Sequence, residues 1–145
     1  MNNTTYDQTP TAARRGLLSL PAGPTDLAAR SLMAAIFILE GFSKISGYEG
    51  NVAYMSSVGL PGFLLPGVIA LEVLGGLALV IGFKVRWVAL ALAGFSVASA
   101  VLFHLDLADQ MQFIMFFKNL AMAGGFLALA NSAPGPWTLD HKLGA

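Results

Sequence analysis

Four long runs of apolar residues dominate the pattern of hydrophobic and polar positions along this chain. They cover residues 27–45, 63–83, 85–103 and 112–130, and polar residues gather between and outside them. Each run is close to the roughly 20 residues that an α-helix needs to cross the hydrocarbon core of a bilayer. None shows the alternation of an amphipathic strand, and alanine and glycine are frequent, as in packed transmembrane helices. We therefore predict an all-α integral membrane protein, a four-transmembrane-helix bundle.

The segments that flank these runs divide the chain into a helical domain and two tails. We expect residues 1–24 to form an N-terminal tail, residues 25–131 the transmembrane domain and residues 132–145 a C-terminal tail. Prolines interrupt the N-terminal stretch before it develops the apolar core of a cleaved signal peptide. The short link at 82–86 predicts an antiparallel hairpin of the second and third helices, and we expect a short interfacial helix near residues 51–58.

Basic residues in the polar segments predict the orientation of the bundle. With four spans, both tails and the link between the second and third helices share one side of the membrane. Because basic loops stay on the cytoplasmic side, the side with more lysine and arginine is expected to be the inside. That side carries Arg14, Arg15, Lys84, Arg86 and Lys142, and the opposite side carries only Lys44. We therefore expect both termini on the cytoplasmic side.

Composition supports the membrane interpretation and argues against several other classes of protein. The 145 residues are 56% hydrophobic but only 11% charged, and the mean hydropathy is +0.69. An average soluble domain has about 25% charged residues, so this chain has too little polar material to cover a soluble surface. A net charge of zero lacks the basic character of a nucleic-acid binder, and we expect no nucleic-acid partner. No cysteine is present, which removes disulfides and thiol chemistry within this chain.

A few charged residues inside the apolar runs are the main candidates for chemistry. A charge near the centre of a membrane helix costs about 2.5–3.5 kcal/mol on insertion scales, so such residues usually face the bundle interior and find partners. The topology places several of them in the outer half of the bundle. We expect one outward-facing polar cluster there, in which Glu72 and Lys118 are coupled. The cluster comprises Glu40, Lys44, Glu72, His104, Lys118 and Asn119, with Asp106 and Asp109 at its rim.

The residues alone leave two interpretations of this cluster open. Its charges can fix the helix register as structural ion pairs, which contribute about 0.6 kcal/mol on average in membrane bundles. Alternatively, they bind a ligand, a proton or the head group of a quinone. A separate pair, Asp26 and Arg30, has the i,i+4 spacing of an ion pair at the inner side. No set of histidines and carboxylates has the spacing of metal ligands, so we expect no metal site.

Five short motifs in order resemble the DoxX family of small four-helix bacterial membrane proteins. The first is RSLMAAIFILEGFSKI, which contains Arg30, Glu40 and Lys44, and VGLPG follows before the second helix. The second helix contains ALEVLGGLALVIGF, the fourth contains FFKNLAMAGGFLAL, and PGPWTLD lies near the end of the chain. The resemblance extends over most of the chain. It implies a multi-pass protein of a bacterial inner membrane.

This resemblance also implies a connection with membrane redox systems, because the family takes its name from a subunit of a thiosulfate:quinone oxidoreductase. We expect a membrane subunit that binds a quinone or another small apolar molecule at the outward-facing cluster, with no intrinsic cofactor. The alternatives are a non-catalytic membrane anchor or assembly subunit for a partner protein, and a small transporter component. The expected partners are the lipid bilayer, a redox partner protein and further copies of the chain. Whether the chain is itself an enzyme stays open.

Overall fold

The computed structural model describes residues 20–144, and these residues form helices and connecting loops without any strand. Arg14 and Arg15 lie outside the described residues. Four helical segments are long and apolar enough to cross a membrane, which confirms the prediction of an all-α, four-span protein. The elements are α1 (Ala22–Ser46), α2 (Tyr48–Ser57), η1 (Gly62–Leu64), α3 (Leu65–Ile81), α4 (Val85–Phe103), α5 (Gln110–Ala130) and α6 (Leu139–Leu143), and η1 and α3 together form the second span.

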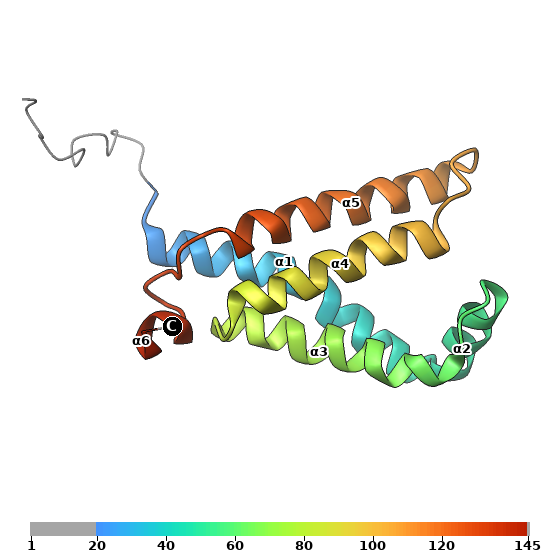
Figure 1. Cartoon of the computed structure of the whole chain (residues 1–145), viewed down its shortest axis with the longest axis horizontal. Helices are drawn as coiled ribbons and strands as arrows, with labels where there is room; N and C mark the ends of the chain where they lie inside the picture. Colours follow the sequence, from blue (N-terminus) through green and yellow to red (C-terminus); the bar gives the residue numbers. More distant parts are fainter. Residues whose placement is uncertain (1–19, 145) are drawn as a thin grey trace, which may run out of the picture.

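The four long helices are arranged as two packed pairs. α1 packs along α3, and α4 packs along α5. The pairs meet mainly through α3 and α4, which a tight turn connects, whereas α1 and α5 contact each other much less. Figure 1 shows α6, the start of α1 and the α3–α4 turn at one end, and α2 and the α4–α5 loop at the other. We call these the α6 end and the α2 end.

The side chains that the long helices expose on the outside of the bundle are mostly apolar. The core is small, and its largest members, Phe37, Leu79, Leu92 and Phe126, are all buried. Between 22% and 33% of the residues in the most apolar part of each span are buried inside the chain. Large apolar side chains such as Leu32 are therefore left exposed over extended areas. A contiguous apolar surface of this size requires an apolar surrounding, which the lipid bilayer supplies.

Two glycines allow α1 and α3 to approach each other closely. A Cβ atom at Gly41 would fall 2.5 Å from Cγ2 of Val73, and one at Gly76 would fall 2.6 Å from Cγ1 of Ile38. Carbon atoms in contact are normally about 3.5–4.0 Å apart, so no side chain fits at either position without a shift. Gly41 also lies against Cβ of Glu72. The close approach therefore places the side chain of Glu72 next to the half of α1 that lies nearer the α2 end.

The C-terminal segment, which the sequence predicts as a tail, is docked onto the α6 end. The carboxylate of Asp140 accepts hydrogen bonds from the backbone N–H groups of Lys84 and Val85, at 2.7 and 2.8 Å. These N–H groups begin α4 and have no partner within the helix, so Asp140 acts as its cap. Thr138 packs against Gly82, whose φ of +74° lies in the left-handed region that favours glycine. The segment thereby holds the α3–α4 turn.

Candidate functional site

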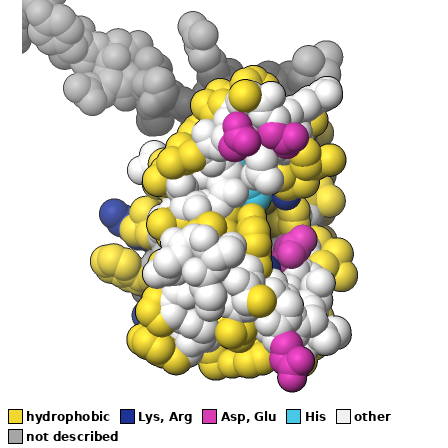
Figure 2. All heavy atoms as spheres, turned by 90° about the vertical axis from the view of Figure 1, so that its right-hand side faces the viewer, with side chains coloured by type: hydrophobic (Ala, Val, Ile, Leu, Met, Phe, Trp, Pro, Cys, Tyr) yellow, Lys and Arg dark blue, Asp and Glu magenta, His cyan; other side chains and the backbone are white. Residues whose placement is uncertain are grey.

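A cavity of about 480 Å³ lies between the two helix pairs at the α2 end. Helices α1 to α5 all contribute to its wall, and most of the lining side chains are apolar or aromatic. Viewed from this end, basic side chains and a histidine lie in a furrow between apolar surfaces, with acidic side chains around it (Figure 2). All six residues of the predicted cluster line the cavity, namely Glu40, Lys44, Glu72, His104, Lys118 and Asn119.

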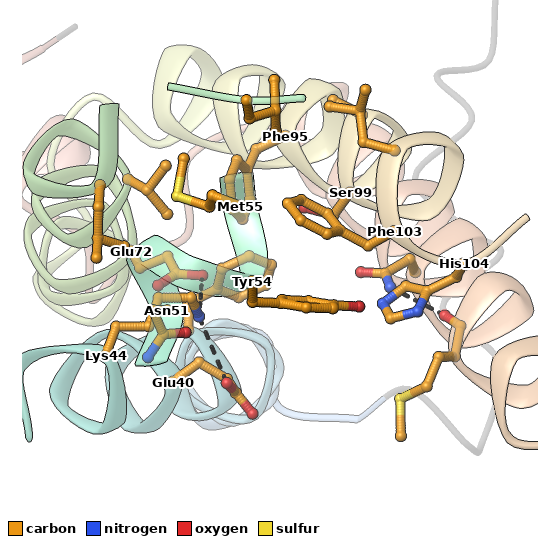
Figure 3. A pocket seen from close by; sticks show the side chains of 18 of the residues that line it. Glu40, Lys44, Asn51, Tyr54, Met55, Glu72, Phe95, Ser99, Phe103 and His104 are labelled. Carbon is orange, nitrogen blue, oxygen red and sulfur yellow. Dashed lines mark hydrogen bonds and ion pairs between the residues drawn. The ribbon is translucent and has the colours of Figure 1, made fainter. Parts of the chain in front are cut away.

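One wall of the cavity carries an ion-paired group from α1 and α3. Nζ of Lys44 lies 3.0 Å from Oε1 of Glu72 and 3.4 Å from Oε2 of Glu40. The side chain of Glu72 is 4% exposed and that of Glu40 is 57% exposed, so only the first contact lies inside the bundle. Figure 3 shows Lys44 between the two carboxylates. The i,i+4 spacing of Glu40 and Lys44 creates one contact, and the close packing of α1 on α3 creates the other.

Two polar groups of the cavity lack strong partners within residues 20–144. Oε2 of Glu72 is buried and has no hydrogen-bond partner there. Nζ of Lys118 lies 3.1 Å from Sδ of Met115, a weak acceptor, and forms no ion pair among the described residues. The sequence suggested that Glu72 and Lys118 are coupled, but Glu72 instead pairs with Lys44. The physical reason is that α3 packs on α1, whereas Lys118 belongs to α5, which packs on α4.

The opposite wall is built around His104. Its Nδ1 atom lies 2.7 Å from Oε1 of Gln112, the first-turn residue of α5 that faces it across the α4–α5 loop. The ring of Phe103 stacks on that of Tyr54 from α2, with centroids 5.1 Å apart. In Figure 3, Tyr54 lies between the Glu72–Lys44 pair and His104. The sequence did not assign Tyr54, Phe103 or Gln112 to the site, because no local motif marks them and only the docking of α2 brings Tyr54 here.

The remaining predicted residues have different positions. Asn119 is buried, and its Nδ2 donates to the carbonyl oxygen of Met115 within α5. Asp106 and Asp109 lie in the loop at the same end but do not line the cavity. Asp109 instead caps α5 by accepting from the backbone N–H of Gln112 at 2.9 Å. Within the described part of the chain, no group of three or more histidines and carboxylates is arranged to hold a metal ion.

The Asp26–Arg30 pair lies at the α6 end, away from the cavity. Arg30 is fully buried, and its Nε lies 2.9 Å from Oδ2 of Asp26. Its Nη1 donates to the carbonyl oxygens of Leu79 and Val80, at 2.5 and 2.6 Å, and its Nη2 reaches that of Trp137 at 3.4 Å. The first two carbonyls belong to the last turn of α3, where helical carbonyls lack their usual partners. Arg30 therefore joins α1, α3 and the docked C-terminal segment.

Comparison with known proteins identifies the family. The DoxX family model matches residues 25–105. Two proteins of Escherichia coli (strain K12) match over most of their length. "Inner membrane protein YqjF" is 49% identical over 117 residues, which cover 81% of this chain and 90% of that protein. "Inner membrane protein YphA" is 37% identical over 123 residues, which cover 80% of this chain and 88% of that protein.

A third relative matches over a shorter segment. The Bacillus subtilis (strain 168) protein named "Putative oxidoreductase CatD" is 34% identical over 64 residues, which are 44% of this chain and 48% of that protein. No solved structure matches the chain significantly. The family match, the two long relatives and the four apolar helices agree with one another. The chain therefore belongs to the DoxX family and is a multi-pass inner membrane protein.

Proposed function

We propose that this protein is a membrane subunit of a redox system and binds a quinone, or another small apolar molecule with a polar head group, in the cavity at the α2 end. The observation that supports this most is the side chain of Glu72, which lines an otherwise largely apolar cavity and whose buried Oε2 atom lacks a hydrogen-bond partner within residues 20–144. Ligand sites are typically apolar concavities with a few converging polar groups. A volume of about 480 Å³ is within the usual range for small-molecule sites.

The distribution of side chains suits a planar ring with polar substituents. Phe37, Phe95 and Phe103 line the cavity together with Tyr54, and aromatic rings pack well against other flat rings. The ammonium groups of Lys44 and Lys118 are donors for the oxygen atoms of a head group. A quinone ring would therefore find apolar contacts on its faces and donors at its edge.

In the proposed redox system, this chain supplies the ligand-binding site, and other proteins supply the remaining parts of the reaction. It contains no cysteine, so a thiol relay has to come from another subunit. We propose a redox partner protein as the source of electrons, in line with the Bacillus subtilis relative CatD, which is named as an oxidoreductase. Lys84, Arg86 and Lys142 lie at or near the α6 end. Under the positive-inside rule, this end is cytoplasmic and the cavity opens toward the outer side.

Mass spectrometry of the purified protein tests this function. The full-length protein is purified in a mild detergent, and the retained small molecules are identified in the wild type, Glu72→Gln and Lys118→Met. Glu49→Gln is the matched control, because Glu49 is an exposed carboxylate on α2 that does not line the cavity. We expect a quinone or another small apolar molecule in the wild type and in the control, and its loss from the folded cavity variants.

The opposite outcome has an equally clear meaning. An empty wild-type protein, together with unfolding of both cavity variants, contradicts the proposed function. The charges would then serve only to hold the helices in register, and the protein would act as a membrane anchor or assembly subunit. Size-exclusion chromatography and circular dichroism establish whether each variant is folded before its bound molecules are compared.

A further inference from the structure

We infer that the head group bound in this cavity carries a hydroxyl that donates a hydrogen bond to Glu72, so that the preferred ligand is a quinol or another phenol rather than a quinone. This inference rests on the proposed function and specifies the chemical class of its ligand. A quinone head group offers only acceptors, whereas a hydroxyl both donates and accepts. The two oxygen atoms of Glu72 show which of these the site requires.

The carboxylate of Glu72 has one oxygen paired and one free. Oε1 accepts from Nζ of Lys44 at 3.0 Å, while the buried Oε2 has no donor within residues 20–144. Because Oε1 forms an ion pair with the ammonium group of Lys44, the carboxylate is treated as ionised, and an ionised carboxylate only accepts hydrogen bonds. The missing partner of Oε2 is therefore a donor. A buried acceptor without a donor is unfavourable, and a ligand that supplies one removes that penalty.

The α5 wall has the complementary requirement. Nζ of Lys118 carries three donor hydrogens, and the acceptor that it contacts among the described residues is the thioether of Met115, at 3.1 Å. The nearby amide nitrogen of Asn119 is also a donor, and it already binds the carbonyl oxygen of Met115. The α5 wall therefore offers a donor and the α3 wall an acceptor. A hydroxyl is the smallest group that serves both, and a quinol carries two.

The same geometry explains why a quinone fits less well. Its carbonyl oxygens can accept from Lys118, but a carbonyl oxygen facing Oε2 of Glu72 would bring two acceptors together. Glu72→Gln replaces one carboxylate oxygen with an amide NH₂ group, which donates. This single change supplies a donor where the wild type has an acceptor. That variant should therefore lose the preference for a hydroxyl over a carbonyl.

Titration of the full-length protein in detergent with two matched pairs of probes tests the inference. The first pair is ubiquinol-1 and ubiquinone-1, measured by calorimetry without oxygen. The second pair is 4-hexylphenol and 4-hexylanisole, in which a methyl ether replaces the hydroxyl and neither compound changes its redox state. Hydrogen bonds to charged groups contribute enough to change affinity by about tenfold or more. We expect the wild type to bind each hydroxyl compound at least about tenfold more tightly than its partner.

The variants and the possible outcomes separate this inference from the proposed function. Glu72→Gln should lose the preference for the hydroxyl compounds, and the control Glu49→Gln should keep it. Equal affinity of the wild type for both members of each pair overturns the inference and leaves the proposed function standing. Failure of all four probes to bind the wild type overturns both. If Glu72→Gln does not fold, the phenol and anisole comparison in the wild type decides the inference alone.

Discussion

Arg30 is the residue whose replacement should destabilise the bundle most. Its side chain is fully buried in a membrane helix, and its guanidinium binds the carboxylate of Asp26 and the carbonyl oxygens of Leu79 and Val80. Methionine has a similar length but no donor. The change Arg30→Met therefore removes all of these hydrogen bonds while keeping most of the volume. Asp26, with a side chain that is 19% exposed, loses its ion-pair partner.

The magnitude of this effect follows from the contacts. A hydrogen bond to a charged group contributes about 1.5–3 kcal/mol, and removing one member of a buried ion pair costs about 3–5 kcal/mol. These contributions overlap, because they belong to one side chain and are not additive. We expect Arg30→Met to lower the free energy of unfolding by about 3–5 kcal/mol. Arg30→Lys keeps the charge but cannot reproduce the planar fork of donors, so its loss should be smaller but clear.

Reversible unfolding in mixed detergent micelles, followed by circular dichroism, measures this loss. Arg86→Met is the matched control, because Arg86 is an exposed arginine in the first turn of α4 and forms no ion pair within residues 20–144. The double variant Asp26→Asn with Arg30→Met should recover part of the loss, since it removes the unpaired carboxylate. A decrease below about 1 kcal/mol for Arg30→Met, or equal decreases for Arg30→Met and the control, would refute this reasoning.

Three further changes test the packing at both ends, with the same unfolding assay. Gly41→Ala should cost about 1–3 kcal/mol by forcing α1 away from α3, whereas Gly94→Ala, which points into open space, should be neutral or slightly stabilising. Asp140→Ala removes the cap of α4 and should cost about 0.5–2 kcal/mol, whereas the exposed Asp106→Ala should stay within about 0.5 kcal/mol. Gly82→Ala should release the C-terminal segment to limited proteolysis, because its Cβ would overlap that segment.

Each of these expectations has an outcome that contradicts it. Equal effects of Gly41→Ala and Gly94→Ala would mean that α1 and α3 do not approach as closely as described. An unchanged unfolding free energy for Asp140→Ala would mean that the N–H groups of α4 have other partners. For Gly82→Ala, the contradicting result is resistance to a protease that cleaves the C-terminal segment only when this segment is undocked. That result would mean that the packing of Gly82 against Thr138 does not hold the segment in place.

The sequence predicts the fold class well because its signals are local. A run of about 20 apolar residues identifies a membrane helix whatever lies elsewhere in the chain. The same applies to charges four residues apart on one helix, and the structure contains both the Asp26–Arg30 and the Glu40–Lys44 contacts. The length of each run and the spacing within it are enough for these predictions. Neither depends on how the helices pack.

Contacts between helices could not be predicted in the same way. The partner of Glu72 depends on how far α1 rotates and how closely it approaches α3, and Gly41 sets that approach. Tyr54 reaches the cavity only because α2 turns back over it, and no pattern in the sequence specifies this. Asp140 caps α4 from a position 55 residues away from Val85 along the chain. All three arrangements depend on helix packing or chain reversal that a single sequence does not reveal.

Photoaffinity labelling with an azidoquinone is the measurement that tests the central claim most directly, because it locates the bound ligand. The full-length protein is labelled in native membranes, and the modified peptides are mapped by mass spectrometry. We predict labels on cavity-lining residues of α2 and α5, such as Tyr54 and Met115, that disappear when excess ubiquinol-1 is added. Labels only on outward-facing residues such as Leu32 and Leu74, insensitive to the competitor and to Glu72→Gln, would contradict a ligand site in this cavity.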